Sequence, residues 1–365
     1  IRRQRQMCIR DSFRSMQIAT DQTVLGNFDD QTLFAHNVRH KLFRRNEEYF
    51  INTLNSEATY QDFKIVHTFG FFPLQQYLVK IGDGKLQALN VAWDSRPKDQ
   101  GGQRWFHLHP DEDITPEHPF HWSNHLANWN SRCADCHSTN LNKNYNSASA
   151  SYSSTFSEIN VSCEACHGSA SKHLEWIENG QLATNKGFDV EKTLPVSWIH
   201  RAGEAIATPK GMVTEREVNM CGSCHSRRVQ IEDAIPLANF HDHYAIDTLD
   251  QDLYFADGQI KDEVFVLGSF LQSKMHRAGV TCSNCHDPHS SRIKIEGNGL
   301  CSQCHAPTVF DTPSHHRHPD NSEGAACVNC HMPARTYMRV DDRRDHSFPV
   351  PIPLIAQATD SPDIC

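Results

Sequence analysis

Twelve of the 14 cysteines in this chain occur in one repeated pattern, in which two cysteines are separated by two residues and a histidine follows directly. The same residues in random order would give about 0.04 copies of the pattern, whereas the sequence contains six. The copies are Cys133, Cys136 and His137; Cys163, Cys166 and His167; Cys221, Cys224 and His225; Cys282, Cys285 and His286; Cys301, Cys304 and His305; and Cys327, Cys330 and His331. Such regularity indicates one kind of chemistry repeated six times.

The spacing within each motif is typical of covalent haem attachment. Two thiols at this spacing can add to the two vinyl groups of one haem, and the adjacent imidazole can then bind the iron. A disulfide framework would not need a histidine at a fixed position. Zinc is the stronger alternative, because 15 residues separate Cys285 from Cys301, as in zinc ribbons. Zinc does not require a histidine after every second cysteine, so the motifs predict six c-type haems, with zinc or redox dithiols as the alternatives.

The composition agrees with a protein whose core is supplied partly by cofactors. The chain has 365 residues, 38% of them hydrophobic, and a formal charge of −9. The six motifs occupy the 199 residues from Cys133 to His331, or about 33 residues per haem, which leaves little room for a separate apolar core. We find no run of about 18 apolar residues that would predict a membrane span. The negative charge, without a Lys/Arg-rich block, argues against nucleic acid as a partner.

Histidines outside the motifs are candidates for the sixth iron ligand. Eighteen of the 24 histidines remain once the six motif histidines are subtracted, which is three for every haem. His/His ligation is therefore expected on most haems, and without a methionine ligand it favours low potentials. His173 and His289 follow a motif histidine so closely that each would have to bind the iron of a neighbouring haem. The next candidates are His276, His315, His346 and His125.

Two further groups of histidines are weaker candidates. His316 and His318 compete with His315, and the sequence does not separate the three. The other group lies before the first motif and consists of His36, His40, His67, His107 and His109. These histidines are expected to have ordinary structural roles, although His107 and His109 alternate onto one face.

The residues before the first motif have the alternating pattern of β-strands. Phe63, Ile65 and His67 alternate, and apolar residues on both sides of Gly82-Asp83-Gly84 predict a β-hairpin within residues 64–94. Residues 46–54 are a weaker strand candidate. Beyond about Pro116 we expect short helices and long loops.

These patterns predict three regions of the chain. Residues 1–12 are expected to be an artefact, residues 13–115 to form a small β-rich N-terminal subdomain, and residues 116–365 to form the multihaem cytochrome c domain. Residues 175–181 and 264–275 are expected to be helical within that last region. The fold class expected for the whole chain is mainly α with long loops, packed around the haems.

Six segments carry a resemblance to a known family: Phe72-Pro73-Leu74-Gln75-Gln76-Tyr77, Gly102-Gln103-Arg104-Trp105-Phe106-His107, Asn128-Trp129-Asn130, Cys163-Glu164-Ala165-Cys166-His167-Gly168, Gly268-Ser269-Phe270-Leu271-Gln272-Ser273 and Cys282-Ser283-Asn284-Cys285-His286-Asp287-Pro288-His289. They resemble a bacterial family of multihaem c-type cytochromes related to hydroxylamine oxidoreductase and octahaem tetrathionate reductase. The resemblance covers about residues 15–358. It implies a location outside the cytoplasmic membrane, in the periplasm or extracellular, and in many members tetratricopeptide repeats after the cytochrome domain.

Both ends of the sequence depart from this family. Residues 1–12 resemble translated sequencing-adapter sequence, which would make Cys8 non-biological. Cys365 is interpreted as the first cysteine of a seventh motif that is cut short. The alternative is that Cys8 and Cys365 are free thiols or form a disulfide.

Two functions compete on these observations. The first is electron transfer between redox partner proteins through a chain of haems, in which the protein sets spacing, ligation and exposure. The second is an oxidoreductase that acts on a small nitrogen or sulfur oxyanion at one five-coordinate haem. Arg335, Tyr337 and Arg339 follow the last motif and could bind such an anion or deliver a proton, although pairing with haem propionates is the favoured interpretation. The sequence contains no Cys-x-x-Cys-Lys motif.

Overall fold

The computed structural model describes residues 15–179, 186–188, 196–232, 239–290 and 292–362. The expectations for residues 1–12, Cys8 and Cys365 fall outside these residues.

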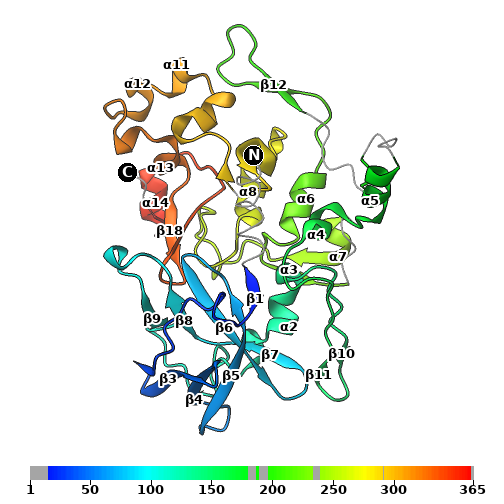
Figure 1. Ribbon diagram of the computed structural model, residues 1–365. Helices are drawn as coiled ribbons and strands as arrows, with labels where there is room; N and C mark the ends of the chain where they lie inside the picture. Colours follow the sequence, from blue (N-terminus) through cyan, green and yellow to red (C-terminus); the bar gives the residue numbers. More distant parts are fainter. Residues whose placement is uncertain (1–14, 180–185, 189–195, 233–238, 291, 363–365) are drawn as a thin grey trace. The chain divides into compact units, whose positions relative to one another are not determined.

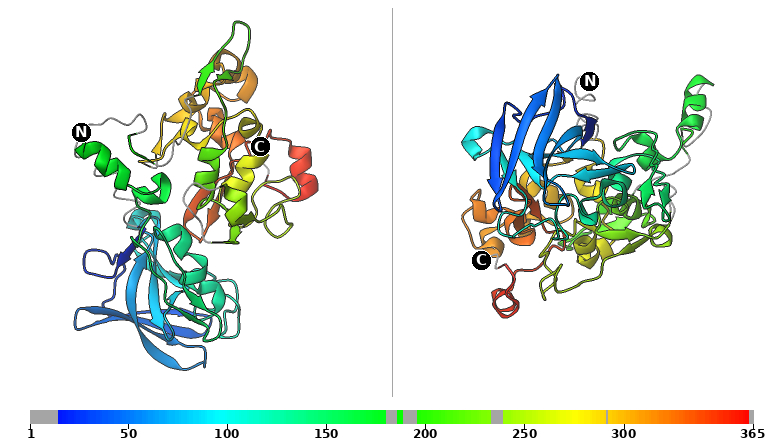
Figure 2. Two further views of the ribbon diagram at one scale, coloured as in Figure 1. Left: turned by 90° about the vertical axis from the view of Figure 1, so that its right-hand side faces the viewer. Right: turned by 90° about the horizontal axis from the view of Figure 1, so that it is seen from below.

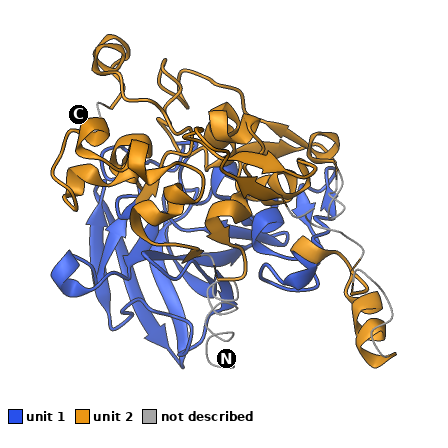
Figure 3. Cartoon of the chain, turned by 90° about the horizontal axis from the view of Figure 1, so that it is seen from above, with its two compact units in different colours: residues 1–165, 338–341 blue, residues 166–337, 342–365 orange. Residues whose placement is uncertain are grey.

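The chain consists of two compact units (Figure 3). Unit 1 contains residues 1–165 and 338–341, and unit 2 contains residues 166–337 and 342–365. The subdomain boundary expected at residue 115 stays a prediction.

Unit 1 is built on a nine-stranded antiparallel sheet (Figures 1 and 2). Strands β2, β3, β4, β5, β6, β8 and β9 lie side by side in that order, while β1 pairs with β5 and β7 pairs with β6. The strands are β1 (Met16–Ile18), β2 (Gln31–Ala35), β3 (Val38–Arg45), β4 (Glu48–Leu54), β5 (Tyr60–Phe69), β6 (Leu74–Ile81), β7 (Lys85–Ala88), β8 (Val91–Asp94) and β9 (Arg104–His107).

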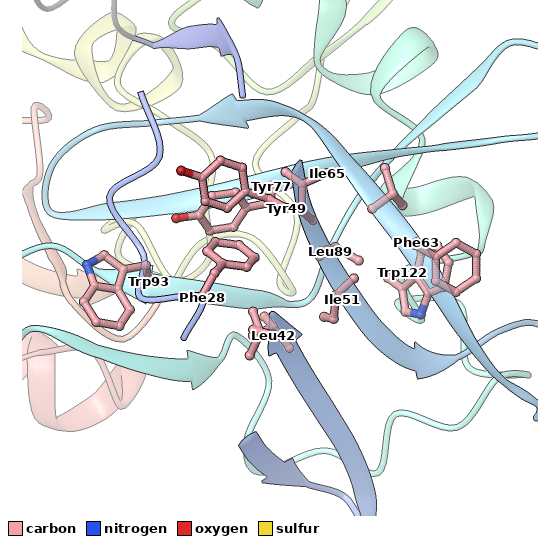
Figure 4. Close-up of a cluster of buried hydrophobic side chains, with 12 residues drawn as sticks. Phe28, Leu42, Tyr49, Ile51, Phe63, Ile65, Tyr77, Leu89, Trp93 and Trp122 are labelled. Atoms are coloured by element: carbon pink, nitrogen blue, oxygen red, sulfur yellow. The ribbon is translucent and has the colours of Figure 1, made fainter. Parts of the chain in front are cut away.

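Alternation along the strands places one face of the sheet in an aromatic-rich core (Figure 4). In β4 the side chains of Tyr49, Ile51 and Thr53 are buried, as expected for a strand with one covered face. Trp122 packs its ring against Phe63 and donates its indole N–H to a backbone carbonyl, so its polar atom is satisfied. The core contains twelve buried side chains: Phe28, Leu42, Tyr49, Ile51, Phe63, Ile65, Tyr77, Val79, Leu89, Val91, Trp93 and Trp122.

The hairpin predicted around Gly82-Asp83-Gly84 is confirmed. Strands β6 and β7 pair antiparallel, with Val79 opposite Gln87. Asp83 and Gly84 both have positive φ, and a Cβ on Gly84 would lie 2.0 Å from the backbone oxygen of Tyr152. Glycine is therefore required at this turn both for its conformation and for the close approach of a neighbouring loop. Strand β4 likewise confirms the weaker strand predicted within residues 46–54.

The expected mainly α fold class is wrong. The structure is 25% helical and 28% strand, and a large antiparallel sheet dominates unit 1. The longest described helix, α5 (Ser171–Glu178), has eight residues. Each haem motif needs only about one helical turn, so repeated motifs do not by themselves produce long helices. The expected helix at residues 264–275 is divided into α8 (Leu267–Gln272) and α9 (Lys274–Arg277) by the extended backbone of Ser273.

Short helices and two-stranded ribbons make up the rest of the described chain. Unit 1 also contains η1 (Lys98–Gln100), η2 (His125–Ala127), α2 (Trp129–Arg132), α3 (Ala134–His137), β10 (Tyr145–Asn146) and β11 (Ser151–Tyr152). Helix α4 (Cys163–His167) spans the division between the units. Unit 2 has the ribbons β12 (Ser197–Ile199) with β13 (Thr208–Lys210), β14 (Arg228–Gln230) with β15 (Tyr244–Ile246), and β16 (His286–Asp287) with β17 (Arg292–Ile293). A further ribbon pairs β18 (Ala334–Tyr337) with β19 (Asp341–Arg344), whose first residue is assigned to unit 1.

Unit 2 has a smaller apolar core and further short helices. Its largest cluster has six buried residues: Val218, Phe240, Tyr244, Leu267, Phe270 and Val280. The helices are α6 (Arg216–Gly222), α7 (Phe240–His243), α10 (Cys282–Cys285), η3 (Gly297–Gln303), α11 (Pro307–Phe310), α12 (Pro313–His316), η4 (Glu323–Ala325), α13 (Cys327–His331) and α14 (Pro353–Thr359).

A cluster of histidines is buried against the sheet of unit 1. The ring of His107 lies 4.7 Å from that of His36 and 6.0 Å from that of His40, measured between centroids. Burial and the neighbouring imidazoles lower the pKa of His40 to about 3, and burial is also the main cause that lowers the pKa values of His107 and His121 to about 4. Two carboxylates lie near the cluster. Glu112 lies close to His109, and the charge of Glu117 raises the pKa of His121, which partly offsets the effect of burial. These buried histidines are neutral at pH 7.

Unit 1 is expected to lose stability as the pH falls below about 6.5. In the folded state His40, His107 and His121 bind protons only near pH 3 to 4, whereas in the unfolded chain they bind protons near pH 6.5. The contribution of these three neutral histidines to the free energy of unfolding is therefore complete above pH 6.5 and is lost as the pH falls toward 4. For His40 alone this loss is about 3 kcal/mol at pH 4. Urea denaturation followed by circular dichroism in the strand band at pH 7, 5.5 and 4.5 measures it. His40→Gln should flatten the dependence, and the exposed His241→Gln should not; an equal dependence in all three proteins would exclude the cluster as its source.

Candidate haem centres

Each motif folds locally into about one turn of helix. In four motifs the backbone N–H of the motif histidine donates to the carbonyl of the first cysteine, at 3.0 Å for His137, 2.9 Å for His225 and 2.9 Å for His305, and likewise for His286. This bond closes a turn in which residues three and four positions apart share one face. Both thiols and the imidazole therefore lie on the same side of the turn, as attachment of one haem requires.

Capping residues begin these turns at defined positions. Thr281 and Asn284 form a capping box at the start of α10, in which the Thr281 backbone N–H donates to Asn284 Oδ1 at 2.8 Å. The buried carboxylate of Glu217 in α6 accepts from the backbone N–H of Ser283 at 2.5 Å and from its hydroxyl at 2.8 Å. A carboxylate at a helix N-terminus is favourable, and here it joins the third motif to the fourth. The sequence patterns did not point to Glu217.

Asn298 makes the corresponding connection between the fifth and sixth motifs. Its side-chain oxygen accepts from the backbone N–H of Cys327 at 2.9 Å, and its amide nitrogen donates to the carbonyl of Ala325 at 2.9 Å. Asn298 belongs to η3, the helix that carries Cys301. The polar atoms of one asparagine thus fix two attachment turns against each other.

Thiol contacts join the same pairs of motifs. None of the twelve motif cysteines forms a disulfide. A hydrogen bond to Cys282 raises the pKa of the Cys221 thiol, and a hydrogen bond to Cys301 raises that of the Cys327 thiol. The third motif therefore lies beside the fourth and the fifth beside the sixth.

The fourth and fifth motifs are also close to each other. Burial and then the nearby Cys304 raise the pKa of the Cys285 thiol. The Gln303 side chain donates to the backbone oxygen of Asn284 at 3.5 Å. The motifs separated by the shortest stretch of sequence are thus neighbours in space.

Three motif histidines lie opposite a second imidazole at nearly the same distance. In each pair one ring belongs to a motif and the other comes from outside the motifs. The pairs, with the distance between ring centroids and the angle between ring planes, are His167 and His289 at 6.0 Å and 4°, His286 and His346 at 6.4 Å and 29°, and His331 and His315 at 6.2 Å and 19°.

This distance fits two ligands on opposite sides of one metal ion. A metal–imidazole bond is about 2 Å long and the bonding nitrogen lies about 1 Å from the ring centre, so the two centroids are about 6 Å apart. Offset stacking of rings covers the same range but does not explain why every pair joins a motif histidine to a histidine outside the motifs. Burial lowers the pKa values of His286 and His346, which keeps both imidazoles in the neutral form that binds metals.

The structure separates three histidines that the sequence left equivalent. His315 faces His331, whereas Nε2 of His316 lies 3.8 Å from the Asp320 carboxylate and the ring of His318 lies against Gly324. Helix α12 begins at Pro313, so His315 and His316 are about 100° apart around its axis and only one of them faces the motif.

Three other candidates do not lie opposite a motif histidine ring in the described part of the chain. His173 stacks on Phe188, with centroids 4.1 Å apart, and its Nδ1 donates to the backbone oxygen of Lys186 at 2.6 Å. Nε2 of His276 lies 3.0 Å from the Glu215 carboxylate. His125, in η2, is exposed.

Hydrogen bonds at Nδ1 leave Nε2 available on two of the paired histidines. Nδ1 of His331 donates to the backbone oxygen of Pro349 at 2.9 Å, and Nδ1 of His346 donates to that of Arg344 at 2.9 Å. Metal-binding histidines usually donate their second ring nitrogen to a carbonyl or carboxylate in this way, which fixes the tautomer and the ring orientation.

His200 is a nearby histidine that the sequence patterns did not single out. The segment after it runs along the fifth motif, where Ala207 donates its N–H to the carbonyl of Cys304 at 2.7 Å and Ile206 forms a bridge with His305. Burial, His331 and His200, in that order, lower the pKa of His305. No spacing rule connects His200 with a motif 100 residues later, so only the fold brings the two together.

The donor set fits covalent haem better than a metal ion held by protein ligands alone. Each motif supplies two cysteine sulfurs and one imidazole from a single turn. Within the described ranges, no group of three or more His, Cys, Asp or Glu side chains is arranged to hold a metal ion.

Comparison with known families agrees with this chemistry. The model of the family described as cytochrome c554 and c-prime matches residues 107–168, which include the first two motifs. The model of the doubled CXXCH motif matches residues 276–310, which include the fourth and fifth. The chain binds haem c covalently. No curated protein and no solved structure matches the chain.

These matches, together with the six motifs, support a multihaem c-type cytochrome. The fourth and fifth motifs of this cytochrome, which the doubled-motif model matches, are neighbours in space, because Cys304 lies near the Cys285 thiol. Among its described residues, no helix has the length and apolar character needed to cross a membrane.

Proposed function

We propose that this cytochrome transfers electrons through six c-type haems, most of them held between two histidines. The observation that supports this most directly is the set of three imidazole pairs with centroids 6.0 to 6.4 Å apart. Haem iron accepts and releases one electron without a bond being made or broken in the protein. The protein supplies two thioether anchors and two axial imidazoles at each such site, and ligation without methionine favours low potentials.

The proposed ligands also define neighbours along the electron path. His289 follows His286 by three residues, yet its ring lies opposite His167, so one short segment would ligate the haems of both the second and the fourth motifs. Thiol and Glu217 contacts place the third motif beside the fourth, and Asn298 places the fifth beside the sixth. The fourth motif would therefore be the branch point of the network.

His173, His276 and His125 remain proposed ligands of lower rank. The hydrogen bond from His173 Nδ1 to Lys186 leaves Nε2 as its ligating atom. His276 would have to leave the carboxylate of Glu215 before it could bind an iron.

An oxidoreductase acting on a small nitrogen or sulfur oxyanion is the second candidate. It is favoured by His225 and His305, motif histidines with no second imidazole ring against them among the described residues. An iron held by one histidine has a position open to substrate. A relation to hydroxylamine oxidoreductase and octahaem tetrathionate reductase belongs to this proposal, as does a location in the periplasm or outside the cell. In either case the electrons come from or go to redox partner proteins.

Electrochemistry of the matured protein distinguishes the two functions. We expect six haems per chain by the pyridine haemochrome assay, complete reduction by dithionite over a broad range of potentials, and no catalytic current with nitrite, hydroxylamine or tetrathionate. The range is broad because the irons are closely packed, so each added electron makes reduction of the next iron less favourable. A sustained current with one of these substrates would favour the oxidoreductase. Zinc in place of haem would contradict both candidates.

A further inference from the structure

A small cavity in unit 2 has more positive than negative side chains around it. Its volume is about 30 Å³, and strands β18 and β19 line it together with residues 259–266. The ionisable residues at its wall are Glu263, Arg335, Tyr337, Arg343, Arg344 and Asp345. Three arginines against two carboxylates leave one positive charge in excess. A cavity of this volume has room for about two water-sized groups.

Four of these ionisable groups already have partners. Arg344 donates to the backbone oxygens of Val328 and Met332, at 3.0 and 2.9 Å. Arg343 pairs with Glu263 at 2.5 Å. Asp345 accepts the backbone N–H of Ile260 at 2.9 Å. These groups build the wall of the cavity and are not needed to bind anything further.

Arg335 and Tyr337 are the two ionisable side chains at the cavity wall that still have hydrogen-bond donors available. Their positions two residues apart in β18 place them on the same face of the strand. Arg335 donates to the backbone oxygen of Ile260 at 3.3 Å and stacks on Phe255, and among the described residues it has no carboxylate partner. Burial raises the pKa of Tyr337 to about 12, so its hydroxyl remains protonated and can donate.

We propose that Arg335 and Tyr337 bind a small carboxylate-like monoanion in this cavity. A guanidinium next to a phenol offers several N–H donors and one O–H donor, which match an anion with two oxygens. Such a group can come from either of two sources, a free anion such as nitrite or formate, or a propionate of a bound haem. Only the second source depends on the proposed haem arrangement.

The holoprotein and its Arg335→Gln and Tyr337→Phe variants test both sources. If the anion is free, isothermal titration calorimetry with sodium nitrite and sodium formate will give saturable binding at one site, weakened at least tenfold by Arg335→Gln and less by Tyr337→Phe. If the anion is a propionate, no added anion will bind, and Arg335→Gln will lower the midpoint potential of one haem, because losing a nearby positive charge favours the ferric state.

Arg339→Gln is the matched control. Arg339 lies in the turn between β18 and β19 and pairs with Asp111, so its loss should change neither binding nor potentials. Haem content and circular dichroism confirm that each variant is folded, and Tyr337→Phe removes only one hydroxyl. The proposal is wrong if Arg335→Gln changes neither anion binding nor any haem potential, or if Arg339→Gln has the same effect.

Discussion

Replacing His289 with alanine will convert one haem from low spin to high spin, and that haem will be the one attached to Cys163 and Cys166. The ring of His289 lies parallel to that of His167, with centroids 6.0 Å apart, so its loss removes one of two axial imidazoles from that iron. An iron left with a single histidine ligand is expected to be high spin. Electron paramagnetic resonance of the oxidised protein should therefore show one new high-spin iron per chain.

The identity of the affected haem can be tested independently. In a Cys163→Ala/Cys166→Ala background the second motif carries no haem, so His289→Ala should add no high-spin signal. His241→Ala is a suitable control because His241 is exposed and its ring contacts only Phe240 among the described residues. A spectrum that stays fully low spin would show that His289 is not an axial ligand. A new signal that persists in the Cys163→Ala/Cys166→Ala background would assign His289 to another haem.

Without haem, unit 1 will keep its sheet while unit 2 will not fold. The sheet has its own core of twelve buried side chains, including Phe28, Tyr77 and Trp93. The largest core cluster of unit 2 has six, and its described helices have at most eight residues, too short to be stable without tertiary packing. Protein made without the cytochrome c assembly system should therefore give a protease-resistant fragment ending near residue 165, where unit 1 ends.

Limited proteolysis with mass spectrometry, supported by amide hydrogen exchange, measures this difference. The haem-loaded protein is the control and should be protected in both units. Equal protection of both units in the haem-free chain would mean that unit 2 folds on its own apolar contacts. Loss of protection throughout would mean that the sheet depends on unit 2 or on haem. Equal protection would contradict the assignment of the haems as the main core of unit 2, and loss throughout would contradict the independent folding of the unit 1 sheet.

The local features of this protein could be predicted from its sequence. A haem attachment site consists of five consecutive residues, and the backbone bond from His225 to Cys221 closes it within a single turn. The hairpin at Gly84 is equally local. The apolar alternation of the two strands and the turn that requires positive φ are both determined by residues adjacent in the sequence. Neither feature depends on contacts with distant parts of the chain.

The extent of the sheet was harder to predict. The sequence indicated a small β-rich part, whereas nine strands pair in the structure. Edge strands such as β2 have few buried side chains, so the apolar alternation that marks a strand is weak there. The number of haem motifs was no guide to helix content, because each motif needs only one turn.

The pairing of histidines was decided by tertiary structure alone. His315 could not be separated from His316 and His318 by spacing, and His200 and Glu217 carried no recognisable pattern. An axial ligand is defined by its distance and orientation to an iron held elsewhere in the chain, and sequence separation does not encode either quantity. The sequence by itself therefore determined that haem is bound and where it is attached, because attachment is covalent and local. Which imidazoles face one another depends on how distant turns pack, and only the folded chain decides that.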